Sequence, residues 1–190
     1  MAKSENNEVM FGARGKVGSL VVFKNYHGGT LISKARKKRE APVYSVDQEA
    51  AKERFREGVI YAKGAIQDEI LSDFYRPYVR PGRSIYNLAL ADFCKPPQVK
   101  SIKTLNYQGS IGDHLAIRAL DNFKVVGIAV TVKKPDGSII ETGPAILAPN
   151  GADWIYTATV VNEDVGGTII SVKVSDTPGN VTFFEQVITS

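Results

Sequence analysis

The chain has 190 residues, of which 43% are hydrophobic and 23% are charged. This composition is typical of globular proteins and excludes disordered and fibrous chains. The length suits one large domain or two small ones. Because Cys94 is the only cysteine, an intrachain disulfide framework and a metal site built from several cysteines are excluded.

The positive charge is concentrated at the N-terminus. Residues 1–40 contain nine lysines and arginines against three glutamates, a net charge of +6. The remaining residues therefore carry −2, since the whole chain carries +4. The basicity belongs to an N-terminal arm and not to the protein as a whole.

The N-terminal segment MAKSENNEVMFG lacks the apolar core of a signal peptide. No later stretch approaches the roughly 18 uninterrupted apolar residues of a membrane span. We therefore expect a soluble protein that is made in the cytoplasm without a signal peptide. Release as part of a particle stays open.

Residues 1–44 are expected to form a basic, glycine-rich arm that contains a β-hairpin. The pattern predicts strands over 18–26 and 30–35, joined by a turn at His27-Gly28-Gly29, because paired glycines supply the positive φ of tight turns. A two-stranded hairpin is marginal alone in water, so we expect it to pack on the rest of the chain or on another subunit. The side chains expected to make this assembly contact are Val21, Val22, Phe23, Tyr26, Leu31 and Ile32.

Residues 45–96 are expected to be helical. Ser45 is the predicted N-cap, and Gln48 completes a capping box. One apolar face is expected to run along Ala51, Phe55, Val59, Ala62, Ile66 and Ile70, at helical spacing. Gly58 and Gly64 indicate a close neighbour or a bend. A shorter helix is predicted over 84–93, and Cys94 at its end is interpreted as a half-buried residue and not as a reactive thiol.

Residues 97–190 are expected to be all β. Alternation of apolar and polar residues predicts seven strands, near 99–105, 114–120, 125–133, 138–142, 154–161, 168–175 and 181–188. Their number and spacing suit a β-sandwich of immunoglobulin-like architecture. The predicted fold class is therefore α+β, with an N-terminal hairpin arm (1–44), a helical segment (45–96) and a seven-stranded immunoglobulin-like β-sandwich (97–190).

No motif of catalysis, cofactor binding or metal binding emerges. The segment Gly12–Ser19 has neither the glycine spacing nor the Lys-Ser/Thr pair of a P-loop. His27 and His114 have no second histidine or cysteine nearby at ligand spacing. The loop residues Asp113, Asp121, Asp176 and Asn180 could meet around calcium, but turn formation is the commoner explanation. We expect no catalytic residue, no cofactor, no metal and no enzyme.

A basic run follows the hairpin, formed by Lys34, Arg36, Lys37, Lys38 and Arg39. Such a run can neutralise phosphates and release counterions, and Tyr26 and Tyr44 could stack on bases. It can equally meet an acidic protein surface. The sequence contains no RRM, KH or zinc-finger signature.

Two resemblances cover most of the chain. The segments GKVGSLVVFKNYHGGTLISK (15–34) and SVDQEAAKERF (45–55) resemble a family of small Bacteroidota proteins of unknown function. The segments KPDGSIIETG (134–143), WIYTAT (154–159) and VKVSDTPGN (172–180) resemble bacterial immunoglobulin-like domains. Neither resemblance implies a catalytic residue.

These observations favour a non-enzymatic assembly protein, a subunit of a homo-oligomer, a filament or a phage-like or injection-type particle, linked through its hairpin arm. Its expected partners are further copies of itself or other particle subunits. The alternative is a nucleic-acid-binding protein that uses residues 14–39. A third hypothesis, a carbohydrate- or surface-binding sandwich with Trp154 or Tyr156 exposed, is disfavoured because the alternation points both side chains into the core.

Overall fold

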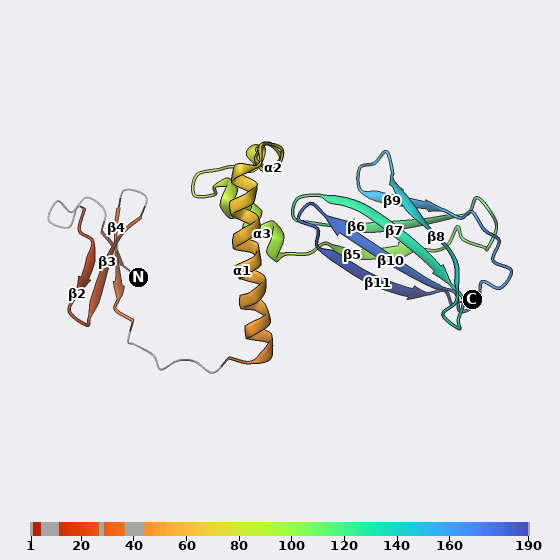
Figure 1. The fold of residues 1–190 in the computed structure, drawn as a ribbon, viewed down its shortest axis with the longest axis horizontal. Helices are drawn as coiled ribbons and strands as arrows, with labels where there is room; N and C mark the ends of the chain where they lie inside the picture. The colour runs from red at the N-terminus through yellow and green to blue at the C-terminus, as the bar shows by residue number, and fades with distance from the viewer. Residues whose placement is uncertain (1, 5–11, 27–28, 37–43, 190) are drawn as a thin grey trace. The chain divides into compact units, whose positions relative to one another are not determined.

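The computed structural model describes residues 2–4, 12–26, 29–36 and 44–189. The chain consists of two compact units, residues 1–45 and residues 46–190, each held together by contacts among its own residues. Helices and strands both occur (Figure 1), which confirms the α+β class.

The first unit is a four-stranded antiparallel sheet, which we call the N-terminal sheet. Its strands are β1 (Ala2–Ser4), β2 (Gly15–Val17), β3 (Val21–Tyr26) and β4 (Gly29–Lys34), in the order β1-β4-β3-β2. The predicted hairpin is present as β3 and β4, but β1 and β2 extend it. Gly18 (φ 56°) belongs to the turn between β2 and β3, where its left-handed backbone suits glycine. The proposed turn residues His27 and Gly28 lie outside the described residues.

The second unit begins with helices. They are α1 (Val46–Gln67), α2 (Glu69–Tyr75), a 3-10 turn η2 (Arg76–Tyr78) and α3 (Ile85–Cys94). Asp68 ends the first helix and caps the second, because its side chain accepts a hydrogen bond from the Leu71 backbone N–H at 3.0 Å. Ser84 caps α3 by accepting from the Asn87 N–H. The shorter predicted helix is confirmed.

The apolar face predicted for the first helix is only partly buried. The buried residues of α1 are the small ones, Gly58, Ala62 and Ala65, whereas Phe55 and Ile66 are about half exposed. A Cβ atom at Gly58 would lie 2.9 Å from Leu90 Cδ1 and 3.3 Å from Cys94 Sγ. The close approach of α3 at Gly58, which only a small residue permits, therefore decides which face of α1 is buried. Cys94 is half-buried, as expected.

Seven antiparallel strands follow, which we call the C-terminal sheet. They are β5 (Gln98–Lys103), β6 (His114–Leu120), β7 (Val125–Lys133), β8 (Ile139–Leu147), β9 (Asp153–Thr157), β10 (Ile169–Asp176) and β11 (Val181–Val187). Their order is β11-β10-β7-β8-β9-β6-β5. The two edge strands approach each other, so the sheet is nearly closed on itself (Figure 1).

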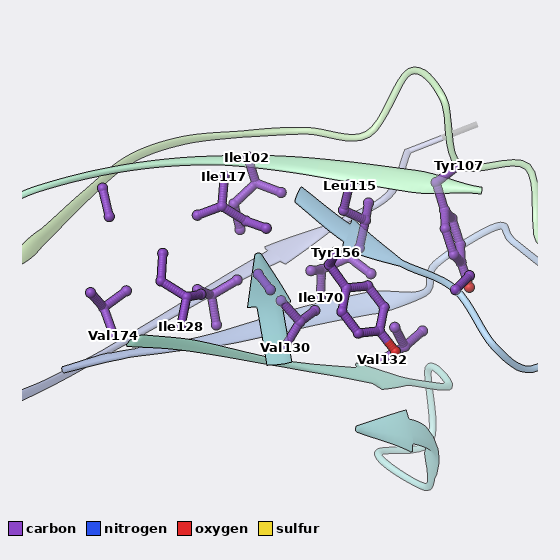
Figure 2. Packing of buried hydrophobic residues seen from close by; sticks show 14 of the residues in the cluster. Ile102, Tyr107, Leu115, Ile117, Ile128, Val130, Val132, Tyr156, Ile170 and Val174 are labelled. Carbon is purple, nitrogen blue, oxygen red and sulfur yellow. The ribbon is translucent and has the colours of Figure 1, made fainter. Parts of the chain in front are cut away.

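The core of the second unit lies inside this sheet. Figure 2 shows side chains from opposite strands pointing toward one another, among them Ile117 and Leu115 above Ile128 and Val130. Tyr156 is buried and Trp154 packs against the same core, which confirms the predicted inward direction of both. The hypothesis of a binding surface built on these two side chains loses its basis.

The helices and the C-terminal sheet are joined through a loop residue. Phe123, between β6 and β7, places its ring 5.3 Å from that of Tyr75 and 5.2 Å from that of Tyr78, both in edge-to-face geometry. Such aromatic pairs contribute beyond simple area burial. Thr182 of β11 adds a hydrogen bond of 2.6 Å to the Pro97 carbonyl, just before β5.

Candidate functional site

The register of the N-terminal sheet sorts its side chains onto two chemically different faces. Residues paired directly across antiparallel strands lie on the same face, and successive residues alternate. Val17 pairs with Val21, and Phe23 pairs with Ile32. Because Val21 and Phe23 are two residues apart on β3, these four side chains share one face, which we call the apolar face.

The opposite face carries lysines. Lys16 pairs with Val22, and Lys24 pairs with Leu31; we call these four residues the basic face. The six residues predicted to make one assembly contact are therefore divided: Val21, Phe23 and Ile32 lie on the apolar face, and Val22 and Leu31 lie on the basic face. The side chain of Tyr26 lies outside the described ones.

The N-terminal sheet has little core of its own. Among the described residues of this unit, only Thr30 and Ala35 are buried. Val17 is 57% exposed, and Val21, Phe23 and Ile32 are half-buried. An apolar face this open is stable only when another layer covers it.

The basic run is described only at its beginning. Lys34, at the end of β4, pairs with Val21 and is exposed, as is Arg36. Lys37, Lys38 and Arg39 lie outside the described residues. Lys34 therefore lies at the end of the apolar face. Lys16 and Lys24, the other lysines of the sheet whose side chains are described, lie on the basic face.

Three aspartates of the second unit form a group that we call the acidic cluster. Asp92 (α3), Asp121 (after β6) and Asp176 (end of β10) have carboxylate oxygens within 4.8 Å of one another. Asp92 is fully buried and accepts a hydrogen bond of 2.7 Å from the Tyr75 hydroxyl, which lies 3.0 Å from the Tyr61 hydroxyl. The sequence placed Asp121 and Asp176 in loops that could meet, but it did not single out Asp92.

Burial sets the protonation of this cluster. It is the main cause that raises the pKa of Asp92 to about 7, with Asp121 and Asp176 adding to the effect and the Tyr75 hydrogen bond opposing it. Burial also raises the pKa of Asp176. A buried carboxyl group near other carboxylates favours its neutral form.

Each aspartate of the acidic cluster already has a structural partner. Asp121 accepts hydrogen bonds from the backbone N–H groups of Phe123 and Lys124. Asp176 accepts from the backbone and the side chain of Asn180. Oxygen ligands in this number can hold a divalent cation, but the hydrogen bonds explain the cluster as a joint between α3 and two loops. Asp113 takes no part, because it lies at the opposite end of β6 and accepts from Gln108 and Ser110.

A second buried carboxylate belongs to Glu141 of β8. Its Oε2 accepts hydrogen bonds from the Thr159 backbone N–H (2.8 Å), the Thr159 hydroxyl (2.7 Å) and the Val160 N–H. Burial, with the nearby Glu141 carboxylate, raises the pKa of Tyr156. Glu141 thus fixes the loop after β9.

A shallow hollow of about 410 Å³ lies on the outside of β5, β6 and β9. It is lined by Lys103, Leu105, Asn106, His114, Ala116 and Ile155. His114 Nδ1 lies 3.1 Å from the Thr157 hydroxyl. Among the described residues that line the hollow there is no carboxylate and no thiol.

Comparison of the chain with protein-family models, with curated proteins and with solved structures finds no match. Within the described ranges, no helix has the combination of length and apolar character that crossing a membrane requires.

Proposed function

We propose that the chain is a non-enzymatic assembly protein, a subunit of a homo-oligomer, a filament or a phage-like or injection-type particle, linked through its N-terminal hairpin arm. One observation carries the proposal: the N-terminal sheet exposes an apolar face, and among its described residues only two are buried. A sheet of this size without a core needs a partner for its stability. The second unit has its own cores and does not need one.

We further propose that the C-terminal sheet is an immunoglobulin-like sandwich. β8 pairs with β7 over six residue pairs but with β9 over only two. A strand that leaves one sheet to join another at its end is the usual way in which two packed sheets remain connected. The absence of paired cysteines means that this likeness concerns architecture alone.

The mass of the nuclease-treated protein in solution tests the assembly proposal. We expect the full chain to form oligomers whose average mass increases with protein concentration. A chain lacking residues 1–40 should be monomeric at every concentration. Light scattering coupled to size-exclusion chromatography gives both masses. A full chain that stays monomeric up to millimolar concentration contradicts the proposal.

The second candidate function is nucleic-acid binding by residues 14–39. The basic face, with Lys16 and Lys24 on one side of the sheet, favours it. We expect such binding to weaken steeply with salt, since each phosphate contact releases a counterion. Replacing Arg36, Lys37, Lys38 and Arg39 by alanine should then reduce the slope of log affinity against log salt. Oligomers that persist after nuclease treatment favour assembly instead.

A further inference from the structure

We propose that the hollow on the outside of β5, β6 and β9 binds a small organic anion, a carboxylate attached to a short apolar body. The site lies in the C-terminal sheet, so the inference goes beyond the assembly proposal and does not depend on it. The volume of about 410 Å³ falls within the range of small-molecule sites, roughly 300–1,000 Å³. The lining combines an apolar floor with a few polar groups, as is usual for such sites.

The register of three strands builds the floor of the hollow. Leu115 and Ile117 point into the core (Figure 2), so Ala116 between them faces outward. Ala116 pairs with Lys103 on one side and with Ile155 on the other, and residues paired in this way share a face. A small alanine between two longer side chains leaves a depression with an apolar floor.

Leu105 extends the apolar surface beyond the end of β5. It lines the hollow and is 88% exposed. An apolar group that covered Leu105 and Ile155 would remove their surface from water, which is favourable in proportion to the area covered. We therefore expect the ligand to have an apolar part.

The polar groups of the hollow can donate hydrogen bonds to an anion. They belong to Lys103, Asn106 and His114. Within the described part of the chain, no residue forms a hydrogen bond or an ion pair with the Lys103 ammonium or with the Asn106 side chain. The Thr157 hydroxyl lies beside His114 Nδ1. When this hydroxyl donates to Nδ1, the ring proton lies on Nε2, where it can be donated to a ligand.

Two carboxylates near these groups already have partners. Asp113, next to His114, accepts hydrogen bonds from two backbone N–H groups. Asp153, two residues before Ile155 on β9, accepts from the Arg118 guanidinium at 3.0 Å. The lysine of the hollow therefore remains available to an anion from solution.

The charge of the lining favours a carboxylate over a phosphate. Among the described residues that line the hollow there is one lysine and no arginine. A single cation suits a singly charged carboxylate, whereas arginine forks are favoured for the bidentate recognition of phosphates.

Binding of three related probes to the full chain tests the proposal. Hexanoate has both parts of the expected ligand, acetate lacks the apolar body, and 1-hexanol lacks the charge. Saturation-transfer NMR of the probe gives the dissociation constants. Because the hollow is shallow, we expect about 0.1–1 mM for hexanoate, and binding at least about tenfold weaker for the other two. The proposal is wrong if hexanoate does not bind saturably below about 10 mM, or if 1-hexanol binds as tightly.

Matched variants show whether hexanoate binds in the hollow. Lys103→Met should weaken its binding at least about fivefold, and Lys100→Met, at another exposed lysine of β5, should change it less than about twofold. Ala116→Ile fills the hollow and should weaken binding at least about tenfold. Ala129→Ile is its control, because Ala129 faces outward from β7 between the core residues Ile128 and Val130. Circular dichroism verifies that each variant is folded. Equal effects of the hollow variants and their controls overturn the proposal.

Discussion

Two glycines of α1 have different surroundings. A Cβ atom at Gly58 would lie 2.9 Å from Leu90 Cδ1 and 3.1 Å from Phe93 Cδ1, whereas a Cβ atom at Gly64 would meet nothing within 4 Å. In a helix interior, alanine is preferred over glycine by about 1 kcal/mol. At Gly58 this gain is opposed by crowding, which costs about 1–3 kcal/mol in a packed site.

We therefore expect Gly64→Ala to stabilise the protein by about 0.5–1 kcal/mol. Gly58→Ala should be less stable than Gly64→Ala by about 1–3 kcal/mol. Urea unfolding followed by circular dichroism measures both free energies. Equal stabilisation by the two substitutions would show that α3 moves away from α1 without cost.

The protonation of Asp92 should make stability depend on pH. Its pKa is about 7 in the folded protein against 3.8 for the free side chain, so the folded state binds this proton more tightly than the unfolded state does. Its contribution is therefore complete below about pH 4 and is lost as the pH rises through about 7. The groups that face Asp92 are Tyr75, Asp121 and Asp176.

We expect Asp92→Asn to reduce this loss, because the amide oxygen still accepts the Tyr75 hydrogen bond but does not ionise. At pH 8 the variant should be more stable than the natural chain by about 1–3 kcal/mol, and at pH 5 the difference should be small. The free energy of unfolding at both pH values gives the result. An equal pH dependence in the two chains would mean that the carboxyl group is ionised at no cost.

At the scale of elements, Phe123 links the helices to the C-terminal sheet through its contacts with Tyr75 and Tyr78. We expect Phe123→Ala to destabilise the protein by about 2–4 kcal/mol, slightly less than the about 3–5 kcal/mol for a fully buried aromatic ring, because Phe123 is half-buried. Phe183→Ala is the matched control: its ring on β11 is 68% exposed, and its removal should cost less than 1 kcal/mol.

The same variant tests whether helices and sheet unfold together. Trp154 is the one tryptophan and packs on the core of the sheet, so its fluorescence reports on the sheet, while circular dichroism at 222 nm reports on the helices. In the natural chain the two signals should change at one urea concentration, and in Phe123→Ala they should separate. Coincident transitions in the variant would show that other contacts suffice.

Much of the C-terminal sheet could be predicted from alternation alone: the bounds expected for β6 and β7 are those observed. The strand β8 was expected to end at residue 142, and a Gly143-Pro144 pair is typical of a strand end. In the structure β8 continues to Leu147. Proline is tolerated there since Pro144 pairs with β7, while β8 is paired with β9 only at Ile146 and Leu147. The sequence of one strand does not reveal that a neighbouring strand pairs with it along one edge only, as β7 does with β8 at Pro144.

The candidate site could be predicted only in part. The apolar residues of the hairpin were identified, but their division into two faces depends on a register that the composition of the arm does not reveal. The acidic cluster was missed at Asp92 because its neighbours, Asp121 and Asp176, are distant in sequence. For α1, the period indicated an apolar face, yet the small size of Gly58, Ala62 and Ala65 decided which face is buried.

At the scale of the whole molecule, the two units should respond differently to dilution. The N-terminal sheet has few buried residues among those described, and the C-terminal sheet has a core. We expect amide hydrogen exchange in β3 and β4 to be at least tenfold faster at low protein concentration than at high concentration. Exchange in β7 and β10 should not change. Protection of β3 and β4 that is independent of concentration would mean that the N-terminal sheet is stable alone.

The path of the chain through the C-terminal sheet determines how it carries a mechanical load. β5 and β11 begin side by side, at Pro97 and Thr182. The chain enters the sheet at the start of β5 and leaves it at the end of β11. A pull along the chain therefore slides the two strands in opposite directions, and the hydrogen bonds of each ladder share the force together. The β10–β11 ladder has seven residue pairs, whereas β5–β6 has five and a shift between Val99 and Ser101. Under tension β5 should yield first, which would release the strand that connects this sheet to the helices and, through them, to the arm.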